Sequence, residues 1–150
     1  MLIKETKPLT VLYFTQKTTL SGLGPFVRTI ARQLYQEACR ADLEVTGPIY
    51  WIYYGMDGQA DTEFTLEIAL PVTHPEAYAG EFQTKKIPSF RCVSGLHTGA
   101  WEKMPETYGQ LIGELMAHRC TMSGICREVY VQMDFTTPEN NVTEVQIGIE

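Results

Sequence analysis

The sequence lacks any apolar run that approaches the roughly 20 residues needed to span a bilayer, so no membrane is expected among its partners. Its first eight residues contain no apolar stretch of the signal-peptide type, which predicts a cytoplasmic location. Basic residues are in the minority, since 12 Lys and Arg against 18 Asp and Glu give a net charge of −6. Nucleic acid is therefore not expected as a direct partner, because binding to the phosphate backbone relies on clustered basic side chains.

Motifs that hold a metal, a cofactor or a catalytic nucleophile are also missing. No CxxC pair occurs among the four cysteines, and His97 and His118 stand at no familiar zinc-ligand interval. The cysteines are predicted to be free thiols, as is typical of a reducing compartment. There is no glycine-rich phosphate loop and no nucleophile elbow. The sequence therefore predicts no metal and no cofactor, and it carries no positive sign of an enzyme.

One order of elements, strand–helix–strand–strand, is predicted twice along the chain. Runs rich in β-branched and aromatic residues predict strands, and each half has one segment whose apolar residues recur at helical spacing. Pro25 and Pro105 stand where these two segments begin, a position that proline favours in a helix. The first half is expected to contain strands at 9–18, 49–56 and 64–70 and a helix from 26 to about 41; the second half, strands at 89–97, 126–134 and 142–149 and a helix opening at Pro105.

These pseudo-repeats, about 9–71 and 89–149, are joined by a proline-rich, polar connector at 72–88. The length of 150 residues suits a single domain, 1–150. A lone unit has one helix on three strands and buries too little apolar surface to be stable. We therefore expect an α+β fold of duplicated β-α-β-β units, with two helices packed on one face of antiparallel sheets and a ligand cleft on the open side.

The chemistry of the open face is predicted from the strand at 126–134. Successive side chains of a strand point to opposite faces. Glu128 and Tyr130 are therefore expected on one face, and Val129, Val131 and Met133 on the other, which we assign to the core.

The first half supplies aromatic side chains at related positions. In the repeat, Trp51 is the counterpart of Glu128 and Tyr53 that of Tyr130, and Tyr13 on the first strand is a further candidate wall. An acid among aromatic rings suits a cationic, flat organic ligand, because aromatic faces attract cations and a desolvated carboxylate complements an ammonium group. The alternative is a solvated glutamate beside core aromatics.

The segment from His97 to Trp101 follows a predicted strand and precedes the second helix. Trp101 is a candidate lid over the cleft; the alternative is an ordinary strand-to-helix turn with Trp101 packed at the domain edge. His97 is a candidate ligand contact or proton carrier because histidine titrates near neutral pH, and a purely structural role is the alternative.

Four segments carry a recognisable pattern: GPIYWIYY (47–54), HTGAWEKMPETYGQL (97–111), REVYV (127–131) and VQIGI (145–149). They resemble the GyrI-like family, the effector-binding domains of many AraC-type and MerR-type multidrug-sensing transcription regulators. The resemblance implies that the halves form a cleft in which Glu128 faces cationic ligands, lined by Tyr130, Trp51 and Tyr53. The chain departs from the family in ending on IGIE (147–150) where isoleucine-proline-leucine is common. No helix-turn-helix fits ahead of Leu9, so a complete one-component regulator is not expected.

Three functions are consistent with these features. The first is a stand-alone small-molecule-binding module for cationic or amphipathic aromatic compounds, acting as a sensor, a sequestering protein or the detached ligand domain of a regulator. The second is a small-molecule hydrolase with Glu128 as general acid or base, helped by Tyr53 or Tyr130. The third is a protein-interaction role of the gyrase-inhibitor kind. The expected partners are a small cationic ligand and either a second copy of the chain or a separate regulator protein.

Overall fold

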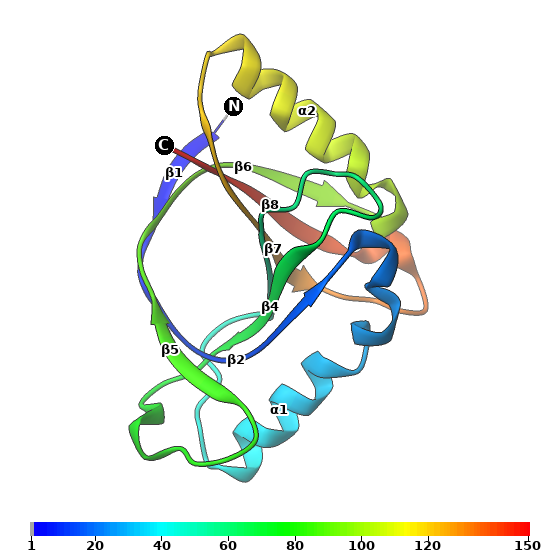
Figure 1. Cartoon of the computed structure of the whole chain (residues 1–150). Coiled ribbons are helices and arrows are strands. Elements are labelled where there is room, and N and C mark those ends of the chain that lie inside the picture. The colour runs from blue at the N-terminus through cyan, green and yellow to red at the C-terminus, as the bar shows by residue number, and fades with distance from the viewer. Residues whose placement is uncertain (1) are drawn as a thin grey trace.

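One eight-stranded antiparallel sheet, with the strand order β1-β6-β8-β7-β3-β4-β2-β5, organises the computed structural model, which describes residues 2–150 (Figure 1). The helices are α1 (Ile30–Arg40) and α2 (Met104–Ala117), so the predicted α+β class is confirmed. Neither helix in this part of the chain is long and apolar enough to cross a membrane. The strands are β1 (Leu2–Thr6), β2 (Leu9–Thr18), β3 (Tyr50–Tyr54), β4 (Phe64–Pro71), β5 (Gln83–Ile87), β6 (Phe90–Thr98), β7 (Met122–Gln132) and β8 (Val142–Ile149).

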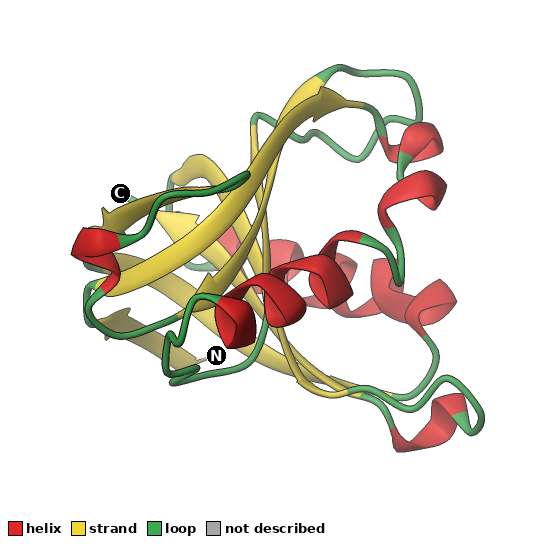
Figure 2. Ribbon diagram, turned by 90° about the horizontal axis from the view of Figure 1, so that it is seen from below, coloured by secondary structure: helices red, strands yellow, loops and turns green. Residues whose placement is uncertain are grey.

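The sheet curls until its two ends approach each other. Lys7 and Pro8 alone connect β1 to β2, although these strands lie near opposite ends of the strand order. Pro88 and Ser89 connect β5 to β6 in the same way. Figure 1 looks along the curl, with both helices outside it, and Figure 2 shows the strands in yellow and the helices in red from below. The sheet therefore has an inner face, within the curl, and an outer face that carries the helices.

The strand order is symmetric about its centre. From one end it runs β1-β6-β8-β7 and from the other β5-β2-β4-β3, and β7 pairs with β3 at the middle, where Trp51 stands opposite Glu128. Each half contains strand, helix, strand, strand along the chain, as β2-α1-β3-β4 and β6-α2-β7-β8. This symmetry supports the predicted duplication, whose boundaries at 9–71 and 89–149 stay a prediction.

The two outermost strands were not predicted. β5 lies inside the expected connector at 72–88 and pairs with β2, and β1 pairs with β6. Their sequences, QTKKI and LIKET, are short and carry lysine. Such residues protect an exposed sheet edge from pairing with other chains, and they weaken the apolar signal by which a strand is recognised.

Helix α1 begins four residues later than its apolar pattern predicts. Residues 24–26 form a 3₁₀ turn, and Arg28 has a φ of +65°, in the left-handed region that an α-helix does not use. This break separates the start of the pattern from the helix and places Arg28 just ahead of α1.

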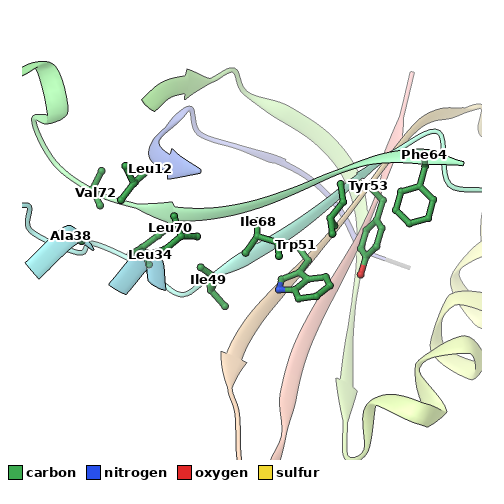
Figure 3. Close-up of a cluster of buried hydrophobic side chains, with 11 residues drawn as sticks. Leu12, Leu34, Ala38, Ile49, Trp51, Tyr53, Phe64, Ile68, Leu70 and Val72 are labelled. Atoms are coloured by element: carbon green, nitrogen blue, oxygen red, sulfur yellow. The ribbon is translucent and has the colours of Figure 1, made fainter. Parts of the chain in front are cut away.

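The helices pack on different halves of the outer face. In α1, Leu34 and Ala38 are fully buried against the first half, in the cluster drawn in Figure 3. In α2, Leu111 and Leu115 are buried against Val145 and its neighbours in the second half. Fully burying a leucine side chain stabilises a fold by about 1.5–3 kcal/mol, so each half fixes its own helix.

The cleft was predicted on the face of the sheet that the helices leave open, but the cavity lies on the face that carries the helices. Glu128 lies on the outer face, because Tyr108 of α2 donates a hydrogen bond to it. Of the residues assigned to the core, Val129 is 5% exposed, but Val131 and Met133 are 56% and 37% exposed, whereas Glu128 is 6% exposed. The alternation along β7 holds as far as Tyr130, beyond which the register against β8 shifts and Met133 lies with Glu128 in the lining of one cavity. The inner face curls on itself and is filled by its own side chains, such as Ile52. The cavity that Glu128 lines lies between the two helices.

Candidate ligand-binding site

A single carboxylate, that of Glu128, stands at the centre of the site. Its Oε2 accepts hydrogen bonds from the Oη of Tyr53 at 2.9 Å and of Tyr130 at 2.7 Å, and its Oε1 accepts one from the Oη of Tyr108 at 3.1 Å. The three donors come from β3, β7 and α2, so both halves hold the same acid. Each hydrogen bond to a charged group contributes about 1.5–3 kcal/mol, which makes a buried negative charge tolerable here.

Burial and hydrogen bonding act on Glu128 in opposite directions. Burial raises the pKa of this carboxyl, and the hydrogen bonds from Tyr130, Tyr53 and Tyr108 offset the rise only in part. Burial and the adjacent carboxylate raise the pKa of each of the three tyrosines well above its usual value. The phenols therefore stay protonated and remain donors, while the carboxyl takes up a proton more readily than an exposed glutamate.

Replacing Tyr130 by phenylalanine is expected to raise the pKa of Glu128 further, because the 2.7 Å donor is lost while the ring remains. The hydrogen bond from Tyr130 favours the charged carboxylate, so its loss favours the protonated form. A pH titration of the Glu128 carboxyl followed by NMR measures this pKa. Tyr54→Phe is the matched control, because Tyr54 donates at 2.8 Å to Glu67 on the inner face. An unchanged Glu128 pKa in Tyr130→Phe would contradict the assigned role of the phenol.

A cavity of about 1060 Å³ opens beside the carboxylate, between α1 and α2. This volume lies at the upper end of the range of about 300–1,000 Å³ that holds drug-sized ligands. Most of the lining residues are apolar, and they come from both helices, from β3 and β7, and from the loops around them; examples are Leu23, Ala31, Met56, Met104 and Ile112.

Four aromatic rings form a continuous contact chain along the cavity wall. Trp51 and Tyr130 meet edge to face with centroids 6.2 Å apart, Trp101 and Tyr130 are 5.7 Å apart, and Trp101 and Phe135 are 5.4 Å apart. Such pairs contribute about 0.5–1.5 kcal/mol each beyond the area that they bury. The wall is therefore rich in π-faces.

The structure brings together five of the seven residues predicted for the site. Glu128, Trp51, Tyr53, Tyr130 and Trp101 all line the cavity. Trp101 forms part of the wall, where it contacts Tyr130.

Tyr13, predicted as a further wall, lies outside the cavity, and that prediction is wrong. Its neighbour Leu12 points to the outer face and is fully buried in the α1 cluster, so Tyr13 points to the inner face. There its Oη donates to Gln83 at 2.8 Å. The error has the same origin as the misplaced cleft, because Tyr13 was assigned to the face away from the helices.

His97 is buried behind the wall and does not line the cavity. Its Nδ1 lies 2.8 Å from Thr107 Oγ1 and its Nε2 lies 2.8 Å from the carbonyl oxygen of Ala100. Both ring nitrogens are thus engaged at the start of α2, and direct ligand contact is not available to this ring. The electrostatic influence of His97 lowers the pKa of Glu128 slightly against the effect of burial.

Some lining residues were missed by the sequence analysis. Tyr108 was given no role, although a tyrosine on the apolar side of a helix calls for a partner for its hydroxyl. Phe135, in the loop after β7, had no signal in the sequence. Arg28 and Arg32 also line the cavity. The helical spacing of 31, 32 and 35 is the signal that would have found Arg32, whereas Arg28 lies ahead of the helix and had no such signal.

Within residues 2–150, no group of three or more histidine, cysteine or acidic side chains is arranged to hold a metal ion. Burial raises the pKa of the Cys126 thiol, which lines the cavity, to about 12, so it stays neutral beside Glu128.

A drug-sized cavity with apolar walls and one buried carboxylate is the arrangement of a small-molecule-binding domain. The chain belongs to the GyrI-like family: the family model described as a GyrI-like small molecule binding domain matches residues 2–150. No curated protein matches the sequence.

Solved structures with the same fold include the C-terminal domain of EcmrR, with a TM-score of 0.77 and 18% identity over 99% of this chain and 96% of that one. EcmrR in its complex with DNA gives a TM-score of 0.80 and 19% identity. This match covers 99% of the present chain but only 56% of the EcmrR chain. SAV2435 bound to tetraphenylphosphonium gives a TM-score of 0.69 and 15% identity, over 99% of this chain and 93% of that one. A hydrolase encoded by lin2189 from Listeria innocua gives a TM-score of 0.70 and 11% identity, over 99% of this chain and 91% of that one. At these identities the likeness shows the fold.

Proposed function

We propose that the cavity binds a hydrophobic aromatic cation, with Glu128 as its counter-charge. The observation that carries the proposal is the buried carboxylate, 6% exposed, held by three phenols in the wall of a cavity with aromatic sides. A buried acid is costly to keep unless it gains an opposite charge, and a bound cation supplies that charge.

The occupied lone pairs of Glu128 narrow the kind of cation. A carboxylate has about four acceptor positions, and three are already taken by tyrosine hydroxyls. A ligand that needs several N–H···O bonds would have to displace a tyrosine. A cation whose charge is delocalised or enclosed by apolar groups avoids this cost, because it interacts with the aromatic faces and the carboxylate through space. The tetraphenylphosphonium bound by SAV2435, a protein of the same fold, is a cation of this kind.

The proposed role is that of a sensor, a sequestering protein or the ligand domain of a transcription regulator, acting in the cytoplasm. Support comes from the likeness to the C-terminal domain of EcmrR, a protein whose solved structures include a complex with DNA. In such a role the domain acts as a homodimer or through a separate regulator protein.

Titration with tetraphenylphosphonium tests the proposed ligand class, because this cation carries no titratable proton. Affinity is expected to fall as the pH is lowered from neutral into the acid range, since burial raises the pKa of Glu128 and its carboxyl becomes neutral before that of an exposed glutamate would. The fluorescence of the two tryptophans reports on binding, because Trp51 and Trp101 both line the cavity. Binding that is absent at every pH, or equally tight at both ends of the range, would contradict the proposal.

Hydrolysis of a reactive, hydrophobic small molecule is the second candidate function. It is favoured by a carboxyl whose raised pKa suits general acid–base chemistry, next to phenols that stay protonated and can donate to a leaving oxygen. The likeness to the lin2189 hydrolase points the same way. Single-turnover assays with lipophilic electrophiles distinguish the two functions: product formation that is abolished in Glu128→Gln supports hydrolysis, and a rate equal in the two proteins argues against it.

A further inference from the structure

Two arginines, Arg28 and Arg32, belong to the lining of the same cavity as Glu128. Arg32 lies in the first turn of α1 and Arg28 just before the helix, and Ala31 and Tyr35 on the same side of this segment also line the cavity. Both arginines are exposed, which places them at the rim, whereas Glu128 is buried in the wall. The cavity therefore has an acidic interior and a basic rim.

Neither guanidinium is paired with an acid of the chain. Among residues 2–150, no carboxylate oxygen lies within 4.0 Å of Arg28 or Arg32. Asp57 is the other acid of the lining, but its Oδ1 accepts from the backbone N–H of Gln59 at 2.9 Å and its Oδ2 from Thr62 Oγ1 at 3.0 Å. Asp57 is thus engaged by its own turn, and the two positive charges are left to the solvent or to a ligand.

Arg28 is nevertheless held in place at the rim. Its guanidinium carbon lies 4.0 Å from the centroid of the Phe135 ring, and Phe135 in turn contacts Trp101. This stacking leaves the edge of the planar guanidinium, with its N–H donors, free to meet a ligand. A guanidinium of this kind recognises carboxylate, sulfonate or phosphate oxygens, with two N–H groups on one anion.

The formal charges of the lining cancel, since Glu128 and Asp57 are matched by Arg28 and Arg32. A site that selects a plain cation gains nothing from two unpaired positive charges at its entrance, because like charges slow entry and lower affinity. We propose that the ligand is amphoteric: an aromatic body with a delocalised positive charge toward Glu128 and an anionic group, such as a carboxylate, at Arg28 and Arg32. This inference rests on the proposed function and names the ligand class of the same site.

Two dyes that share one xanthylium cation test the inference: rhodamine 6G, an ethyl ester, and rhodamine 19, its free carboxylic acid. Wild-type protein is expected to bind rhodamine 19 at least about fivefold more tightly at low salt, since about 1 kcal/mol is gained from the carboxylate. In the double variant Arg28→Gln/Arg32→Gln, the affinity for rhodamine 19 is expected to fall to that of the ester, whereas the affinity for rhodamine 6G stays the same or rises. Arg91→Gln, which removes an exposed arginine of β6 outside the cavity, is the matched control and is expected to keep the wild-type preference.

The outcomes separate this inference from the proposed function. One outcome is that wild type binds rhodamine 6G, that Glu128→Gln binds this dye more weakly, and that wild type does not prefer rhodamine 19. In that case the amphoteric ligand class is wrong and the cation site stands. An equal loss of affinity for both dyes in the double variant overturns the inference as well, because the arginines then act only through the fold. If neither dye nor tetraphenylphosphonium binds the wild type, both proposals fall together.

Discussion

Replacing Glu128 by glutamine is expected to weaken the binding of tetraphenylphosphonium by about 30-fold or more. Removing one partner of a desolvated charge pair costs about 2 kcal/mol or more, and about 1.4 kcal/mol is a factor of ten in affinity. The effect is large because Glu128 is buried and because the other acid of the lining, Asp57, is exposed and engaged by its own turn. Isothermal titration calorimetry at neutral pH measures the change.

The same substitution is expected to leave the stability of the free protein equal or higher at neutral pH. Because the folded-state pKa of Glu128 is raised, the folded chain binds the proton more tightly than the unfolded chain. The favourable contribution of this group is therefore present at low pH and is lost as the pH rises through the raised value. Glutamine carries no charge to desolvate, so the melting temperature of Glu128→Gln is expected to match or exceed that of wild type near pH 7. In acid, where Glu128 is protonated, the two melting temperatures are expected to converge.

Glu67→Gln is the matched control for this pair of measurements. Glu67 is also buried and also accepts a tyrosine hydroxyl, from Tyr54, but it faces the inside of the curl, where Lys85 lies 2.6 Å away. Its replacement is expected to leave tetraphenylphosphonium affinity unchanged and to lower stability, because it breaks a partly buried ion pair. Equal losses of affinity in the two variants would show that the cation does not sit beside Glu128.

Shortening Leu34 to alanine is expected to lower the free energy of unfolding by about 2–5 kcal/mol, the cost of a cavity at a fully buried leucine. Leu34 is the anchor of α1 on the first half, where it packs in the cluster with Leu12 and Ile68 (Figure 3). Urea denaturation measures the change. The neighbouring turn of α1 carries the cavity-lining Ala31 and Tyr35, so ligand affinity is expected to fall as well.

Met116→Ala is the control for this stability measurement. Met116 lies on α2 and is 72% exposed, so its truncation removes little buried surface and is expected to change stability by no more than about 0.5 kcal/mol. A loss in Leu34→Ala as small as that of Met116→Ala would mean that α1 is not fixed by its contacts with the sheet.

Much of the fold could be predicted from local patterns. The strand at 142–149 and the helix opening at Pro105 are found within a residue of their predicted limits, because alternation, apolar periodicity and proline placement are properties of the segment itself. β1 and β5 escaped prediction because their stability comes from the neighbours β6 and β2, not from their own composition. Pairing between segments distant in sequence leaves no local signal.

The residues around Glu128 could be predicted from the sequence, but the face of the sheet on which the cavity lies could not. Alternation grouped Glu128 with Tyr130, and the repeat added Trp51 and Tyr53, all of which line the cavity. Alternation separates two faces, however, and does not tell which one meets the helices. The curl of the sheet decides that question, and it depends on connections such as Lys7–Pro8 that join distant strands. Tyr13 was misplaced, and Tyr108 left without a role, for this one reason.

The short links between β1 and β2 and between β5 and β6 also limit how far the two halves can move relative to each other. The halves are joined along the β3–β7 ladder and again at these two links on the far side of the curl. A hinge about the ladder would have to stretch both links, each only two residues long. We infer that the halves move as one body and that the cavity adapts through side-chain rotamers and through the loops after β2 and β7. The size of the cavity is then set by its lining side chains and by these loops, and not by the angle between the halves.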